Sequence, residues 1–160
     1  MVEKIISGGQ TGVDRAALDF AIKVGIPHGG WIIRGRLAED GAVGQQYQLQ
    51  EIGSRSYPIR TKRNIEDSDG TLIFSDAGSE GGMLRRGSGT QLTASYAEQV
   101  HKPLYVVRLD EEQDMLLVRD WIDRHQIRTL NVAGPRESRS PGIYQKVVRL
   151  LHVMHQRKVF

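Results

Sequence analysis

The chain has 160 residues, 22 Lys and Arg against 19 Asp and Glu, and no cysteine. The lack of cysteine excludes disulfides and thiolate zinc sites, and no stretch approaches the roughly 20 apolar residues of a membrane span, so we expect a soluble, cytoplasmic protein. The net charge of +3 suits an anionic partner but is too weak alone to indicate nucleic-acid binding.

The N-terminal segment predicts a strand, a glycine-rich turn and a helix. The apolar run Val2–Ile6 is typical of a buried strand. Beyond the turn, apolar residues fall on one helical face, at Val13, Ala16, Ala17, Phe20, Ala21 and Val24, and Gly25 is a plausible C-terminal cap. Such a unit directs backbone N–H groups and the positive end of the helix dipole to one point, where an anion is stabilised.

The turn itself is our first candidate binding site, and its predicted ligand contacts are Gly8, Gly9, Gln10, Thr11 and Gly12. No Gly-Lys-Ser/Thr follows, so the turn is not a Walker A loop, and only Gly9-x-x-Gly12 fits the dinucleotide fingerprint. A β-branched residue in place of Gly9 is therefore expected to abolish binding and to leave the fold largely intact.

Asp14 follows in the first helical turn. It either complements the helix dipole or contacts a ligand hydroxyl, and the sequence leaves both interpretations open.

Apolar runs and amphipathic stretches then alternate along the chain. We expect strands at 29–33, 71–74, 103–107 and 129–134, and helices at 61–68, 90–100, 115–124 and after Ser140-Pro141. Between them we expect a charged loop at 34–41, a helical turn at 47–51 and an extended segment at 56–59.

More detailed expectations concern helix faces and caps. The inner face of the helix at 90–100 is assigned to Leu92, Tyr96, Ala97 and Val100, and that of the helix at 115–124 to Val118, Trp121 and Ile122. The last helix should bury Ile143, Val147, Leu150, Leu151 and Met154. Asp110 and Gln113 have the spacing of a capping box, and Ser140 is the expected N-cap of the last helix.

Strands that alternate with helices indicate one doubly wound, Rossmann-like α/β domain over residues 1–160, with about five to seven mostly parallel strands and helices on both faces. Ligands of such sheets bind beyond the carboxyl ends of the strands. The loops Ser7–Thr11, Arg34–Gly41, Ser75–Thr90 and Ala133–Ser138 all follow strands. We therefore expect these four loops to share one edge of the sheet.

That edge carries groups that suit an anion. A second glycine turn comprises Gly87, Ser88, Gly89 and Thr90, and arginines are frequent, at Arg34, Arg36, Arg60, Arg85, Arg86 and Arg136. The acids Glu39, Asp40, Asp67, Asp69 and Glu137 could hold Mg²⁺ or hydrogen-bond a heterocycle or sugar. His152 and His155 are three residues apart, but no third metal ligand is evident, so we predict no metal site in the protein itself.

Several blocks resemble the family named putative molybdenum carrier. They are Ser7–Asp19, Gly29–Trp31, Gly35-Arg36, Ala38–Gly41, Arg60-Thr61 with Asn64, Asp67–Ile73, Gly89-Thr90 with Thr93, and Asn131–Ser138. They occur in the expected order over nearly the whole chain, and the first block is specific.

The resemblance implies a Rossmann-like fold of the group that includes LOG phosphoribohydrolases, lysine-decarboxylase-like proteins and DprA. It implies a bound molybdenum cofactor (molybdopterin), a pterin that bears a phosphate, or a related nucleotide. By position, Gly8–Gly12 and Gly87–Thr90 would be the phosphate and pterin-edge turns, with Arg36, Arg60 and Asn64 as supporting contacts. It further implies molybdoenzymes as recipients and, by analogy, a homodimer or homotetramer.

The chain departs from the pattern at two places. Ile32-Ile33 stand where the family pattern has Cys-Pro, so any thiol role there is absent. The LOG motif P-G-G-x-G-T-x-x-E aligns with residues 85–93, and Thr93 replaces its glutamate. A threonine hydroxyl cannot serve as that general acid or base at neutral pH, which favours binding over hydrolysis.

Three functions follow in order of preference. The first is a carrier that binds a phosphorylated heterocycle. The second is a nucleotide or phosphoribosyl hydrolase that uses Asp14, Glu39 or Asp67. The third is a nucleic-acid-binding protein, whose affinity would fall steeply with salt.

Overall fold

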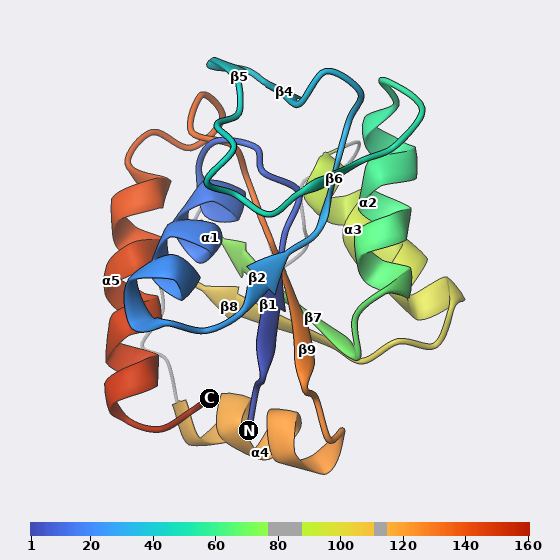
Figure 1. Cartoon of the computed structure of the whole chain (residues 1–160). Helices are drawn as coiled ribbons and strands as arrows, with labels where there is room; N and C mark the ends of the chain where they lie inside the picture. The colour runs from blue at the N-terminus through green and yellow to red at the C-terminus, as the bar shows by residue number, and fades with distance from the viewer. Residues whose placement is uncertain (77–87, 111–114) are drawn as a thin grey trace.

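The computed structural model describes residues 1–76, 88–110 and 115–160. Its centre is a five-stranded sheet in the order β2-β1-β9-β7-β8, in which every neighbouring pair is parallel (Figure 1). The strands are β1 (Lys4–Ile6), β2 (His28–Gly29), β7 (Gly70–Ser75), β8 (Leu104–Arg108) and β9 (Thr129–Ala133). A parallel order of this kind requires a crossover between consecutive strands, which the helices provide.

Helices lie on both sides of this sheet. Figure 1 shows α1 (Val13–Val24) and α5 (Ile143–Gln156) side by side on one face, and α2 (Tyr57–Glu66) and α3 (Gly89–Gln99) side by side on the other. The remaining helix of the described residues, α4 (Met115–Arg124), lies near the two termini. The prediction of a doubly wound α/β fold is confirmed. No helix in the described ranges has the length and apolar character that crossing a membrane requires.

The two faces of the sheet differ in chemistry. Leu72 and Phe74 of β7 belong to the main hydrophobic cluster, which also contains the inner faces of α1, α4 and α5. Because side chains alternate along a strand, Thr71, Ile73 and Ser75 point to the α2/α3 side. All five side chains are buried. The layer between the sheet and helices α2 and α3 is therefore mixed, with buried polar Thr71 and Ser75 beside apolar Ile73.

The polar side chains of this layer explain why the inner face predicted for α3 was correct only at Ala97. On α3 the buried residues are Thr90, Thr93 and Ala97, whereas Leu92, Tyr96 and Val100 are only half-buried. Tyr96 instead reaches α2, where its hydroxyl donates to Glu66 at 2.5 Å. An apolar pattern identifies an inner face only when the surface beneath it is apolar, and here it is not.

Three segments between β1 and β7 differ from expectation. The strand predicted at 29–33 is two strands, β2 and β3 (Trp31–Ile32), and β3 pairs with β6 (Gln50–Glu51) outside the central sheet. The helical turn predicted at 47–51 is therefore wrong. The charged loop at 34–41 contains strand β4 (Leu37–Ala38), which forms a hairpin with β5 (Gly41–Ala42).

Two helix starts were also predicted wrongly. The extended segment at 56–59 is the first turn of α2, because Pro58 in a first helical turn needs no hydrogen-bond donor. The last helix has Gly142 as its N-cap, not Ser140, and the Glu137 carboxylate accepts from the N–H of Gly142 and of Tyr144. The core stripe of α5 is confirmed except for half-buried Leu150, and the inner face of α4 is confirmed. The capping box at 110–113 extends outside the described residues.

Candidate functional site

Three of the four predicted loops meet at the carboxyl edge of the sheet. Thr11, which follows β1, donates its hydroxyl hydrogen to Glu39 and accepts from the N–H of Glu137 at 3.2 Å. The Gln10 side-chain oxygen accepts from the N–H of Glu39 at 2.8 Å. The loops after β1, β4 and β9 are thus held together by hydrogen bonds, as the sheet edge predicts. At the fourth loop, Asp76 contacts the Ser140 hydroxyl.

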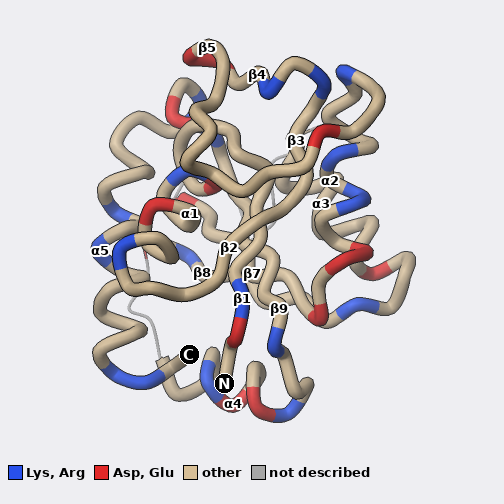
Figure 2. The backbone as a smooth tube through the Cα atoms, in the orientation of Figure 1, with Lys and Arg blue, Asp and Glu red and all other residues tan. Residues whose placement is uncertain are grey.

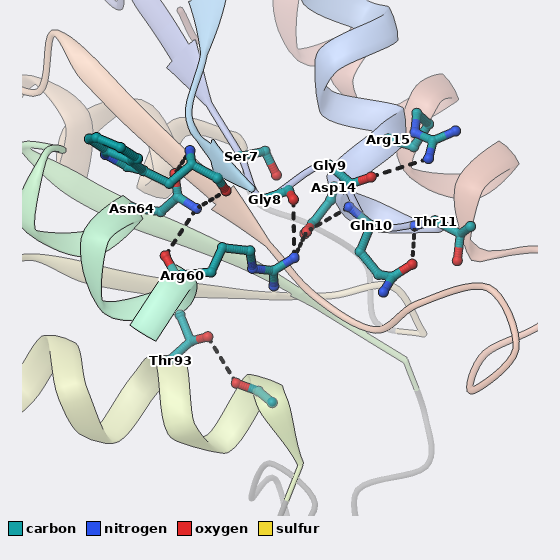
Figure 3. A network of polar contacts seen from close by, with 12 residues as sticks. Ser7, Gly8, Gly9, Gln10, Thr11, Asp14, Arg15, Arg60, Asn64 and Thr93 are labelled. Atoms are coloured by element: carbon teal, nitrogen blue, oxygen red, sulfur yellow. Dashed lines mark hydrogen bonds and ion pairs between the residues drawn. The ribbon is translucent and has the colours of Figure 1, made fainter. Parts of the chain in front are cut away.

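The first glycine turn binds part of its own chain (Figure 3). The N–H of Gln10 donates to the Asp14 carboxylate at 3.3 Å, and the N–H of Thr11 donates to the Gln10 side-chain oxygen at 3.0 Å. Val13, the first residue of α1, donates its N–H to Pro135 O at 3.2 Å. No acceptor in the described part of the chain pairs with the N–H groups of Gly8 or Gly9. Nor does one pair with the N–H of Gly12, so these three groups are the N–H donors of the turn without a partner in the described residues.

Arg60 reaches the first glycine turn from α2, which lies on the other face of the sheet from α1 (Figure 1). Its Nη1 donates to Gly8 O at 3.1 Å and lies 3.4 Å from Asp14 Oδ2 (Figure 3). The guanidinium covers Gly8 so closely that a Cβ atom there would lie 2.5 Å from Arg60 Cζ. Its Nε is buried without a hydrogen-bond partner. Gly8 therefore admits the guanidinium, which brings a positive charge and an unused donor to the turn.

Asp14 is the buried counter-ion of Arg60. Burial raises the pKa of the Asp14 carboxyl above its ordinary value of 3.8, and Arg60, the N–H of Gln10 and the Ser7 hydroxyl oppose this effect. The Ser7 hydroxyl also donates to Val132 O at 2.6 Å. Asp14 thus faces the protein interior and the guanidinium.

The raised pKa of Asp14 predicts a pH dependence of stability. Between the unfolded value near 3.8 and the higher folded pKa, the folded state binds more protons than the unfolded state. The free energy of unfolding contributed by this group should therefore decrease as pH rises through that window. Urea unfolding at several pH values between about 3.5 and 7, with Asp14→Asn as the reference, measures it. Identical profiles of the two proteins would contradict the expectation.

Gly9 does not behave as the sequence suggested. Its φ of +75° belongs to the left-handed region, and a Cβ there would lie 2.6 Å from Leu49 Cδ1. A β-branched residue would strain the backbone and displace Leu49, which is buried. Such a variant is therefore expected to lose stability, and whether it keeps its fold stays a prediction. Loss of binding in it would not separate a ligand contact from a folding defect.

Arg36 holds a loop of its own chain. Its guanidinium donates to four backbone oxygens, those of Val43, Gly44, Tyr47 and Leu49, at 2.8 to 3.1 Å. Four of its five N–H groups are thereby used. The loop that contains β5 and leads to β6 depends on these bonds, and a ligand contact from Arg36 stays a prediction.

Asn64 also has a structural role, because its side chain joins α2 to β3. Its Oδ1 accepts from the N–H of Trp31 at 2.9 Å, and its Nδ2 donates to Trp31 O at 3.1 Å. The amide thus ties α2 to β3 as a neighbouring strand would. This places Arg60, one helical turn earlier on α2, against the glycine turn.

The second glycine turn begins α3. Ser88 caps the helix by accepting from the N–H of Gln91 at 3.1 Å, and Gly89 and Thr90 are its first two residues. A Cβ at Gly89 would meet no atom of the described residues within 4 Å. Gly87, the remaining predicted contact, lies outside the described residues.

The residue that replaces the LOG glutamate is part of α3. The Thr93 side chain is buried, and its hydroxyl donates to Gly89 O at 2.9 Å (Figure 3). Of the carboxylates considered as substitutes, Asp67 accepts from the Trp31 indole at 2.6 Å, and Asp14 and Glu39 have the contacts given above. Within residues 1–76, 88–110 and 115–160, no three His, Asp or Glu side chains gather where a metal ion could be held.

Sequence reasoning missed two contributors to the site. Ser7 contacts both Asp14 and β9, and Arg15 donates to Gly9 O at 3.1 Å and pairs with Asp40 at 3.2 Å. Both residues flank the glycine turn in the chain. Their polar side chains at buried or half-buried positions were the available signal.

The comparisons with known proteins agree with this architecture. The model of the circularly permuted YpsA SLOG family matches residues 5–155. A crystal structure of a protein named putative molybdenum carrier protein, from Syntrophus aciditrophicus SB, is 49% identical in sequence, covers 96% of this chain and 94% of its own, and superposes with a TM-score of 0.87. A search of curated proteins finds no match. The resemblance inferred from the sequence is confirmed.

Proposed function

The chain belongs to the circularly permuted YpsA SLOG family, and on that premise we propose that it is a carrier that binds a phosphorylated heterocycle. The ligand would be molybdenum cofactor or a related nucleotide. The name of the similar crystal structure, together with the anion-binding chemistry of the site, supports this ligand class.

One observation carries the proposal. Arg60 places a mostly buried guanidinium, with an unused Nε donor, at the carboxyl end of β1. The N–H groups of Gly8 and Gly9 and the start of α3 frame the same edge. Arginine, backbone N–H groups and a helix N-terminus are the donors that proteins use for phosphate.

The geometry favours holding the ligand over cleaving it. The threonine at position 93 spends its hydroxyl on Gly89 O, and it has no group that titrates near neutral pH. Asp14 is paired with Arg60 and lies in the protein interior. Any Mg²⁺ at the site would arrive with the ligand. Molybdoenzymes would be the proteins that receive the ligand from this carrier.

The ligand class can be tested on the purified protein. Native mass spectrometry should find a retained phosphorylated small molecule. Calorimetric titration should show that AMP binds at least about tenfold more tightly than adenosine, because the site recognises the phosphate. Equal affinities for AMP and adenosine, or no binding of AMP or GMP together with no retained molecule, would refute the proposal.

A variant at the start of α3 tests where the ligand lies. In Gly89→Val the added Cβ meets no atom of the described residues within 4 Å, so its melting temperature should stay within about 2 °C of wild type. Its affinity for AMP should fall by at least about tenfold, because the side chain blocks the helix N-terminus. Gly53→Val is the matched control, since a Cβ there also meets nothing within 4 Å. Unchanged AMP affinity in Gly89→Val would remove α3 from the site.

A further inference from the structure

A separate group of hydrogen-bond donors surrounds the Glu39 carboxylate. The Thr11 hydroxyl donates to its Oε1, the Ser138 hydroxyl donates to its Oε2, and the N–H of Ser138 donates to Oε1 at 3.1 Å. Arg136 Nε lies 3.5 Å from Oε2. One carboxylate thus receives three hydrogen bonds and one ion pair, and it belongs to none of the elements that supply these donors.

The donors are held in place without Glu39. Thr11 follows β1 and Ser138 follows β9, and these strands are parallel neighbours, so their carboxyl ends lie side by side. The Thr11 hydroxyl oxygen accepts from the N–H of Glu137, whose carboxylate caps α5. The cluster of donors is therefore built into the sheet edge and the helix start.

Glu39 comes from an element outside the central sheet, which the N–H of Glu39 and the Asp40–Arg15 ion pair attach to the first glycine turn. It lies at the tip of the β4–β5 hairpin, whose two strands pair only with each other and contribute two residues each. The hairpin stands above the ends of β1 and β9 in Figure 1, and its acidic tip is visible in Figure 2. The Glu39 side chain is 22% exposed, so its carboxylate borders solvent.

We propose that Thr11, Arg136 and Ser138 form a binding site for a tetrahedral oxyanion such as a phosphoryl group, and that Glu39 occupies this site as a built-in anion. Two hydroxyls, one N–H and a guanidinium match the donors that phosphate accepts from. An incoming oxyanion displaces the Glu39 carboxylate from these donors. The site shares Thr11 with the proposed ligand edge, but it does not depend on the heterocycle proposed above.

Glu39→Ala tests this site with inorganic phosphate as the probe. Amide NMR signals of Thr11 and Ser138 should shift on phosphate addition and should saturate at a concentration at least about tenfold lower in Glu39→Ala than in wild type. Asp40→Ala is the matched control, because it removes the same charge from the same tip but pairs with Arg15. Phosphate should bind this control as it binds wild type. Glu39→Gln keeps the shape of the side chain and should show an intermediate gain.

Two outcomes would overturn the assignment. Equal phosphate affinity in Glu39→Ala and Asp40→Ala would show that only net charge matters. If the amide signals of Thr11 and Ser138 in a folded Glu39→Ala variant do not shift on phosphate addition, Glu39 has only a structural role and does not occupy an anion site. Ser138→Ala in the Glu39→Ala background should cancel the gain, because two of the donors to the anion come from Ser138 and one of them is lost.

An AMP titration of the same variants separates a free oxyanion from the phosphoryl group of a nucleotide. Tighter AMP binding by Glu39→Ala assigns this site to the nucleotide phosphate, and an unchanged AMP affinity beside tighter phosphate binding assigns it to a free oxyanion. A wild-type protein that binds no phosphorylated heterocycle, together with a gain of phosphate binding in Glu39→Ala, would refute the proposed function and support the oxyanion site. The opposite pattern would refute only the oxyanion site.

Discussion

Gly30→Ala should be among the most destabilising single substitutions in this protein. Gly30 has a φ of +127°, and a Cβ there would lie 2.1 Å from Ser7 O and 2.9 Å from Asn64 Oδ1. The first neighbour is backbone, which cannot move without breaking the pairing of β1 and β2. We expect a loss of about 3 to 5 kcal/mol in the free energy of unfolding. Urea unfolding followed by circular dichroism measures it.

Gly25→Ala is the matched control for backbone strain alone. Gly25 has a φ of +74°, but a Cβ there meets nothing within 4 Å. Alanine should cost only about 1 to 2 kcal/mol, the penalty of a left-handed conformation. The difference between the two variants then measures the steric contact with Ser7 together with the additional strain of a φ of +127°. Equal losses would show that the close approach at Gly30 has no energetic consequence.

The same contact explains why the second strand was predicted imperfectly. The pattern of residues 29–33 is that of one strand, yet Gly30 turns the chain against Ser7, so β2 joins the central sheet and β3 leaves it. Such a turn depends on a neighbour in space, which no local pattern contains. By contrast, the bounds of α1 and the C-terminal end of α4 were predicted correctly because their apolar periodicity is strong and local.

The site shows the same division between local and long-range information. The meeting of the loops after β1 and β9 follows from their pairing in the parallel sheet, whereas the hairpin that carries Glu39 lies outside that sheet and reaches the same edge through its own hydrogen bonds. The partners of individual side chains did not follow. The side chains of Arg36 and Asn64 bind backbone groups of other residues, and the Gln10 N–H binds Asp14. Buried polar groups must find partners within reach after folding.

This internal pairing changes the chemistry expected of the first glycine turn. A bare strand–turn–helix unit offers its N–H groups to an anion, but here Asp14 already neutralises part of the turn from inside. The positive charge at the turn is therefore supplied by Arg60, and its ion pair with Asp14 fixes the position of that charge. The free energy of this pair can be measured.

Asp14→Ala should destabilise the protein by about 3 kcal/mol, because it leaves the Arg60 guanidinium buried without its counter-ion and the Gln10 N–H without its acceptor. Below neutral pH, Arg60→Ala should lower the free energy of unfolding by less than Asp14→Ala does. Burial already raises the pKa of Asp14, so its carboxyl can take up a proton when Arg60 is removed. The double variant should lose less than the sum of the two single losses, by about 1.5 to 3 kcal/mol. Denaturant unfolding of the four proteins at about pH 7 gives this coupling free energy.

Gly8→Ala supplies an independent measure of where the guanidinium lies. In wild type the added Cβ would lie 2.5 Å from Arg60 Cζ, so the side chain must leave the turn and lose Asp14. In the Arg60→Ala background the same substitution meets no guanidinium and should cost less than about 1 kcal/mol. Additive losses in both cycles would mean that Arg60 does not rest on the turn in solution. Strong coupling in both would establish that one buried ion pair holds the Arg60 guanidinium against the first glycine turn.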